Sequence, residues 1–288
     1  MGICVATTAA AVLLATVSVA EERGSSVPEI AASGTDIEQT GTAESPPYDR
    51  ISTEYIKGYV SDGRRILAEP IEWNGDDWLK VGLLIGAASG IYFADADIRN
   101  FVQKNQSSAG DRTASAGNAL GNPLVAAPSL GLFYLYGQLN DDPKARRTSL
   151  LALESLTISG AIAMTIKQAT QRPRPSSGEA PTTWDGPSLR TTDSSFPSIH
   201  AQSAFSIAAV FAEEYSDTPL VPPLAYGLAS FVCLSRIYSN KHWSSDVFSG
   251  AIIGYFVGKA VVRYHTPALK ILPTVSKQGL GLIAEYRF

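Results

Sequence analysis

The sequence contains few cysteines and few histidines. Only two cysteines occur in 288 residues, and Cys4 falls in the first apolar run, so Cys233 would be alone in a processed chain. A single thiol excludes an intramolecular disulfide, and the apolar surroundings of Cys233 predict an ordinary buried side chain. No cysteines and histidines have the spacing of a metal site, so the sequence predicts neither a metal site nor a cofactor.

An excess of positive charge is also missing. Lys and Arg number 23 against 27 Asp and Glu, which gives a formal net charge of −4. Proteins that bind nucleic acid carry a basic patch or stripe that attracts phosphates. Nucleic acid is therefore excluded as an expected partner.

Six apolar runs follow Asp76, and none shows the alternation of a strand. Each run is long enough for a helix, and Thr148, Asp217 and Ser244 are the predicted N-caps. The predicted helices are Trp78–Phe93, Pro123–Leu139, Ser149–Ile166, Ala201–Ala212, Pro219–Leu234 and Val247–Val262. The predicted fold class is all-α, a bundle of about six helices over residues 76–266 with the active site at the helix ends on one face.

The two ends of the chain differ from this helical region. Residues 1–20 have an apolar core followed by Ser18-Val19-Ala20, the small-x-small pattern of a signal peptide cleavage site, with a membrane anchor as the alternative. Residues 21–75 are predicted to be a largely disordered or surface linker, of which Ile51–Trp73 would pack on the domain or lie along its surface. Residues 267–288 form a C-terminal tail whose last ten residues alternate like a short strand.

Three blocks of polar residues lie at the ends of the predicted helices. They read K-x6-R-P from Lys167, P-S-x-H ending at His200, and S-R-x5-H-x3-D around His242. Lys167, Arg174 and Arg236 supply positive charge and hydrogen-bond donors to one small anion, and phosphoryl transfer depends mostly on such positioning and electrostatics. Two histidines can divide nucleophilic attack and proton transfer.

In order and spacing, these blocks resemble the type 2 phosphatidic acid phosphatase superfamily, which includes bacterial non-specific acid phosphatases and vanadium-dependent haloperoxidases. The resemblance spans roughly Trp78 to His265. It implies that His242 is the nucleophile that becomes a phosphohistidine, that Asp246 fixes the tautomer of His242, and that His200 is the general acid.

The resemblance also implies which residues bind the phosphate: Lys167, Arg174, Ser198, the backbone N–H of Ile199, and Arg236. The family usually has glycine where this chain has Ile199. A positive φ at that position would strain a β-branched residue by about 1–2 kcal/mol, whereas a negative φ would keep the N–H and change only the shape of the site.

The implied function is metal-independent hydrolysis of a phosphomonoester or diphosphate, with a phosphorylated lipid as the expected substrate. Two polar segments, 94–122 and 176–190, are expected to form loops at the mouth of the site and to select the substrate. Four alternatives stay open: a soluble periplasmic acid phosphatase, a lipid-headgroup phosphotransferase, a haloperoxidase that holds vanadate, and a non-catalytic protein that binds phosphate or lipid. The third histidine, His265, is expected at the surface.

The apolar runs are compatible both with helices that span a membrane and with helices of a water-soluble domain. Most are shorter than the about 20 residues that a bilayer core requires, and prolines or charges interrupt four of them. The glycines between Ser249 and Gly258 suit close helix packing in either setting. We expect a location in the cell envelope, exported and either membrane-associated or periplasmic.

Overall fold

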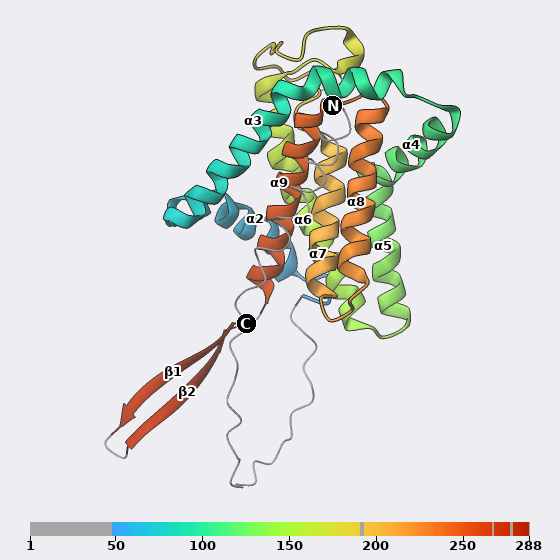
Figure 1. Cartoon of the computed structure of the whole chain (residues 1–288). Coiled ribbons are helices and arrows are strands. Elements are labelled where there is room, and N and C mark those ends of the chain that lie inside the picture. The colour runs from blue at the N-terminus through green and yellow to red at the C-terminus, as the bar shows by residue number, and fades with distance from the viewer. Residues whose placement is uncertain (1–47, 191–192, 267, 277–278, 288) are drawn as a thin grey trace. The chain divides into compact units, whose positions relative to one another are not determined.

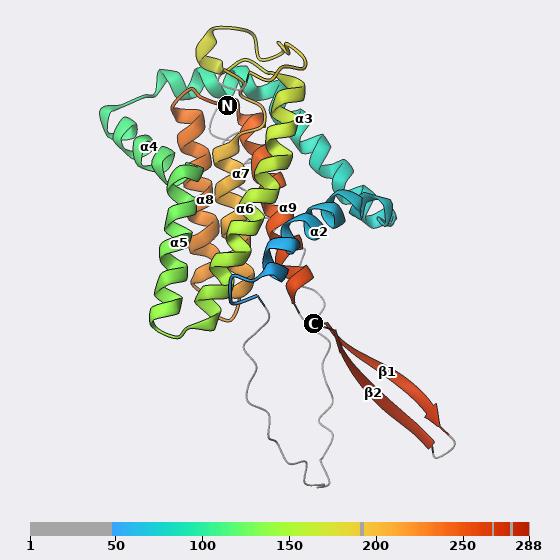
Figure 2. The same cartoon turned by 180° about the vertical axis from the view of Figure 1, so that it is seen from behind.

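The computed structural model describes residues 48–190, 193–266, 268–276 and 279–287, and describes side chains as far as residue 266. The predicted signal peptide, residues 1–20, and the first part of the predicted linker lie outside these ranges. Helices dominate the described residues (Figures 1 and 2). The elements are α2 (Thr53–Ala68), η1 (Glu69–Ile71), α3 (Gly75–Lys104), α4 (Ser108–Leu120), α5 (Pro123–Leu139), α6 (Pro143–Thr170), η2 (Pro175–Ser177), α7 (Ile199–Glu214), α8 (Val221–Tyr238), α9 (Ser244–His265), β1 (Ala268–Ser276) and β2 (Gly279–Arg287).

The predicted helical bundle is confirmed, because each of the six apolar runs lies in a helix, except that α8 begins two residues after Pro219. These helices are α3, α5, α6, α7, α8 and α9, and all but α5 extend beyond the predicted run into polar turns. At the start of α3, for example, the side chain of Asn74 accepts hydrogen bonds from the backbone N–H groups of Asp76 and Asp77. A cap of this kind lets the helix begin ahead of its apolar stretch.

All three predicted N-caps are wrong, because the helices begin elsewhere; Ser244, for example, is the first residue of α9 and follows its N-cap. Asp142 caps α6, and Thr148 lies inside that helix, where its hydroxyl donates to the carbonyl of Lys144. Helix α8 begins at Val221 without a side-chain cap, and Asp217 instead pairs with Lys144 at 2.9 Å. A polar residue close to an apolar run can cap the helix or pair with another side chain, and tertiary packing decides which of the two it does.

The loop predicted over residues 94–122 is also wrong. Helix α3 continues through the first part of this segment, and α4 forms in the second part. Helix α4 lacks an apolar stripe and packs on α8 through small residues. At Gly117, an added Cβ would overlap the side chain of Ser235, so only glycine allows the two helices to approach this closely.

Helix α7 packs against α6, α8 and α9, and the four lie side by side in both views (Figures 1 and 2). The contact between α7 and α9 depends on Gly250, Gly254 and Gly258, which lie one turn apart on α9. A Cβ at Gly250 would overlap the carbonyl oxygen of Ser198, and one at Gly254 would overlap that of Gln202. The predicted role of these glycines in close helix packing is therefore confirmed.

Helix α2 lies inside the segment 21–75 and packs on α6 and α9. Its Tyr55 is buried and donates a hydrogen bond of 2.9 Å to the carbonyl of Leu150. Of the two arrangements open for residues 51–73, the structure shows packing on the helical domain. The division of the chain into domains stays a prediction.

The C-terminal residues form a hairpin. Strands β1 and β2 pair antiparallel, with Ala268 opposite Arg287 and Ser276 opposite Gly279. Strand β2 includes most of the alternating segment from which a short strand was predicted.

Three of the described helices, α3, α6 and α9, are long and apolar enough to cross a membrane. Only 6% of the most apolar window of α3 is buried, so its apolar side chains are largely uncovered. Large exposed apolar side chains gather on α3, α5 and α8: Trp78, Leu79, Leu83, Ile85, Phe93, Phe101, Leu124, Leu132, Leu135, Leu139, Leu224, Leu228 and Leu234. Exposed apolar surface on this scale indicates contact with a membrane, and the chain is membrane-associated.

Candidate active site

The motif residues lie where four helices end. Helix α6 ends and α7 begins near one another, as do the end of α8 and the start of α9, at the upper end of the bundle in Figure 1. Lys167 is in the last turn of α6, Ser198 caps α7, Arg236 is in the last turn of α8 and Asp246 is in the first turn of α9. Arg174 and His242 lie in the connecting loops.

The ring of His242 is buried and held through one nitrogen. Its Nδ1 lies 2.7 Å from the carbonyl oxygen of Ser195, and a carbonyl can only accept a hydrogen bond. Nδ1 therefore carries the proton, and the lone pair is on Nε2. The Asp246 carboxylate, expected at this position, is 3.9 Å from Nδ1, so the closer partner of the ring is the main chain of Ser195. The sequence pattern did not identify Ser195, because a backbone carbonyl leaves no mark on residue type.

Asp246 makes two other short contacts. One carboxylate oxygen accepts a hydrogen bond of 2.8 Å from the backbone N–H of Trp243, and the other accepts one of 2.6 Å from Nη1 of Arg172. Trp243 is thus the N-cap residue of α9, and the predicted cap Ser244 is the first residue of the helix. Asp246 fixes the loop that carries His242, which positions the ring indirectly.

Arg172 is fully buried, although its sequence neighbourhood resembles an ordinary charged loop. Besides Asp246, its guanidinium binds Asp95 of α3 at 2.7 Å, the hydroxyl of Ser245 at 2.8 Å and the carbonyl of Pro181. The sequence offered one signal for this contact, the carboxylate of Asp95 within the apolar helix α3, because a buried charge requires a partner. Arg172 links α3 and α9 to the loop between α6 and α7.

The three predicted cations, Lys167, Arg174 and Arg236, lie at the ends of α6 and α8 and in the loop between α6 and α7. Lys167 is 4% exposed and donates a hydrogen bond of 2.9 Å to the carbonyl of Ser194. Arg236 donates one of 2.7 Å to Asn118 of α4, a residue that the sequence pattern did not identify. In the part of the chain that the structure describes, Nε of Arg174 and Nε of Arg236 are buried without an acceptor. Buried guanidinium donors of this kind suit the oxygens of an anion.

Electrostatic interactions connect the histidines to these cations. Burial first, and then the charges of Arg236, Lys167, Arg174 and His200, hold the pKa of His242 well below its usual range. Burial, followed by Arg236 and Arg174, lowers the pKa of His200 to about 4. The two histidines and the three predicted cations therefore lie near one another, in surroundings rich in positive charge.

Ile199 adopts an unstrained conformation. It is the first residue of α7, and the described non-glycine residues with positive φ do not include it. The backbone N–H of Ser198 donates to the carbonyl of Asp246 at 3.0 Å, which joins the start of α7 to that of α9. The first N–H groups of a helix have no partner within it and favour anions. The β-branched side chain therefore introduces no backbone strain, and the backbone N–H of Ile199 is retained at the start of α7.

A polar pocket of about 440 Å³ adjoins Arg236 through Asn118. It is lined by residues from the end of α3, from α4 and from the loop after α8: Gln103, Gln106, Asp111, Ala114, Ser115, Asn118, Tyr238, Ser239 and Asn240. Part of the segment expected at the mouth of the site, residues 94–122, contributes to this pocket.

The structure thus brings two histidines and three basic side chains together at the ends of packed helices. Residues 148–270 match the family model described as the PAP2 superfamily. The matched residues include all three motif blocks, and the resemblance inferred from those motifs is confirmed.

Several individual proteins are similar to the chain. Over 70 residues, 24% of this chain and 16% of the relative, it is 44% identical to the lipid A 1-phosphatase of Porphyromonas gingivalis. Over 123 residues, 41% of this chain and 62% of the relative, it is 36% identical to the decaprenylphosphoryl-5-phosphoribose phosphatase of Mycobacterium tuberculosis. The chain thus spans less than two thirds of each of these relatives. The structure of a transmembrane PAP2-type phosphatidylglycerolphosphate phosphatase from Bacillus subtilis matches with a TM-score of 0.48 and 19% identity, covering 74% of this chain and 96% of the other.

Proposed function

We propose that the chain is a phosphatase that hydrolyses a lipid phosphomonoester or diphosphate through a phosphohistidine on His242, without a metal in the reaction. One observation carries the proposal: the buried ring of His242 has its Nδ1–H held 2.7 Å from the Ser195 carbonyl, among the charges of Lys167, Arg174 and Arg236. This arrangement directs a neutral nitrogen lone pair into a site that attracts anions.

The first step forms a bond between Nε2 of His242 and phosphorus. The bond from phosphorus to the leaving oxygen breaks with its electron pair, and His200 gives that oxygen a proton. Lys167, Arg174, Arg236 and the N-terminus of α7 stabilise the charge on the other phosphate oxygens.

In the second step, water attacks the phosphohistidine. His200, now neutral, removes a proton from the water, and the phosphorus–nitrogen bond breaks to release phosphate and restore His242. His200 has a lowered pKa in the protein alone. The negative charge of a bound phosphate favours its protonated form, so the substrate itself prepares the general acid.

The exposed apolar side chains on α3, α5 and α8 support a lipid substrate, because a site at the end of membrane-contacting helices meets the headgroups of lipids. The names of two relatives, a lipid A 1-phosphatase and a decaprenylphosphoryl-5-phosphoribose phosphatase, describe phosphatases of lipid-linked phosphates. The pocket beside Asn118 would hold the polar part of the substrate. As part of the proposal, the small-x-small pattern before Glu21 supports export to the cell envelope.

The decisive experiment measures phosphate release by the purified chain in detergent, with a chelator present. A short-chain lipid phosphate or diphosphate is compared with p-nitrophenyl phosphate. We expect release that favours the lipid substrate, and acid-labile labelling of the protein when the reaction with a phosphorus-labelled substrate is stopped in alkali.

Two variants serve as controls. His242→Ala should lose release and labelling together, whereas Lys241→Ala, next to it and exposed, should retain both. A preference for p-nitrophenyl phosphate would favour a soluble-substrate phosphatase. A folded chain that binds phosphate without turnover would overturn the proposal, as would halide oxidation with added vanadate in place of hydrolysis.

A further inference from the structure

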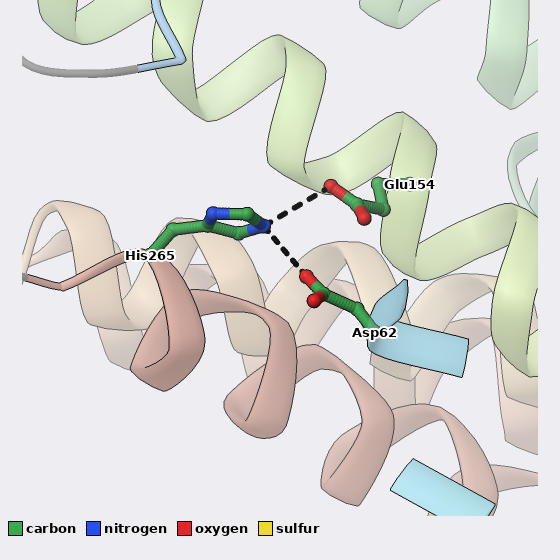
Figure 3. Close-up of side chains that lie close together, drawn as sticks. All are labelled: Asp62, Glu154 and His265. Atoms are coloured by element: carbon green, nitrogen blue, oxygen red, sulfur yellow. Dashed lines mark ion pairs between the residues drawn. The ribbon is translucent and has the colours of Figure 1, made fainter. Parts of the chain in front are cut away.

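The third histidine does not lie at the surface, as the sequence predicted. His265 ends α9 and is 7% exposed, and its ring faces the carboxylates of Asp62 from α2 and Glu154 from α6 (Figure 3). Glu154 is completely buried and Asp62 is 8% exposed. Side chains of three separate helices therefore converge at one buried point.

The distances in this cluster are compatible with ligands around one ion. Nε2 of His265 lies 2.8 Å from Oδ2 of Asp62 and 3.4 Å from Oε2 of Glu154, and one ligand atom from each residue lies within 4.8 Å of the others. Metal–ligand bonds of about 2.0–2.1 Å at angles between about 90° and 110° place neighbouring ligand atoms about 2.8–3.4 Å apart. The two short separations fall within this interval.

The same atoms lack hydrogen bonds. Among the described residues, both carboxylate oxygens of Glu154, Oδ2 of Asp62 and Nε2 of His265 are buried without a hydrogen-bond partner of acceptable geometry. The imidazole is close enough to form ion pairs, but a hydrogen on Nε2 is not aligned with either carboxylate. Even a protonated His265 balances only one of two ionised carboxylates, and a bound cation would offset the other.

We propose that Asp62, Glu154 and His265 bind one divalent transition-metal ion, with Zn²⁺ the best match. One imidazole and two carboxylates are established zinc ligands, and three protein ligands leave a fourth position for water. Tyr48, whose ring centroid is 3.9 Å from that of His265, covers the imidazole. The ion fastens α2 to α6 and α9.

This site is separate from the proposed phosphatase site. Asp246 lies in the first turn of α9 and His265 ends it, so the helical rise places them roughly 28 Å apart. The ion is therefore structural, and the reaction at His242 proceeds without it.

The test uses the full chain in detergent, stripped with a chelator and titrated with zinc chloride alone. Calorimetry should show one ion bound per chain, and the thermal unfolding midpoint should rise with zinc. Glu154→Gln should weaken zinc binding by at least about tenfold, because it removes one ligand charge while keeping the side-chain volume. Glu213→Gln, which alters a glutamate of α7 paired with Lys259, is the matched control and should bind zinc like the parent.

A measurement on the unaltered chain keeps the proposal open to refutation if the variant fails to fold. X-ray absorption at the zinc edge should show one imidazole and otherwise oxygen ligands, unchanged in His242→Ala. Absence of stoichiometric zinc binding would overturn the proposal. So would equal affinity in Glu154→Gln, or a ligand shell that contains sulfur.

Discussion

Arg172 and Asp246 form an ion pair of 2.6 Å, and neither side chain is exposed to solvent. The same guanidinium lies 2.7 Å from the buried carboxylate of Asp95. One arginine thus neutralises carboxylates from two helices, α3 and α9, directly behind the loop that carries His242. The rigidity of the site depends on this residue, although we assign it no contact with phosphate.

Replacing Arg172 should be severely destabilising. Arg172→Met leaves two buried carboxylates without a counter-charge, and we expect the free energy of unfolding to fall by about 3–5 kcal/mol. Chemical unfolding in detergent, followed by circular dichroism, measures this loss. Arg263→Gln, which removes an exposed ion pair with Glu69, should cost at most about 1 kcal/mol. Equal losses in the two variants would contradict the assigned role.

Adding a methyl group to α9 should test the close approach to α7. A Cβ at Gly254 would overlap the carbonyl oxygen of Gln202, so we expect Gly254→Ala to destabilise the protein by about 1–3 kcal/mol. Gly227→Ala in α8, where nothing lies within 4 Å of the added atom, should stabilise by about 0.5–1 kcal/mol through helix propensity. Thermal unfolding of the two variants should shift in opposite directions, and a shift in the same direction would refute the packing argument.

The two site histidines should make stability depend on pH. Both have a pKa below the value of about 6.5 expected in the unfolded chain, and that of His200 is about 4. Below pH 6.5 these two histidines bind more protons in the unfolded chain than in the folded one. Their contribution to stability is therefore complete above this pH and is lost as the pH drops toward 4. The unfolding midpoint should therefore decrease between pH 7 and pH 5.

The slope of this decrease identifies the groups responsible. A His200→Gln/His242→Gln double variant should show a flatter profile over the same range, with carboxylates accounting for what remains. An unchanged slope in the double variant would assign the pH dependence to other residues.

Ile199→Gly restores the residue that the family usually has. Because φ at Ile199 is not positive, glycine relieves no strain, and it should lower the free energy of unfolding by about 0.5–1 kcal/mol through its cost in a helix. We expect kcat/KM for a lipid phosphate to change by less than about tenfold. Ile199→Ala separates the loss of the side chain from the backbone effect. A gain of activity well beyond tenfold in both variants would show that the isoleucine side chain obstructs the site.

The helices and the motif blocks could be predicted from the sequence because both are local properties. An apolar run of sufficient length forms a helix in most surroundings, and the spacing within each block places Lys167, His200 and His242 near helix ends. Helix boundaries were less predictable. Thr148 and Asp217 have suitable side chains for capping, but Asp142 competes for one cap and Lys144 pairs with Asp217.

Tertiary packing decided the contacts between distant segments. The carbonyl that holds His242 belongs to Ser195, and the partners of Arg172 come from two helices. Such contacts depend on how closely α7 and α9 approach, which the glycines of α9 allow.

The sequence by itself determined the helical architecture and the placement of three basic side chains and two histidines at helix ends. Only the tertiary structure decided that His265 is buried against Asp62 and Glu154. The physical reason is that charge and helix length belong to residues and short segments. Burial and metal-ligand geometry, by contrast, arise only when helices far apart in the chain pack together.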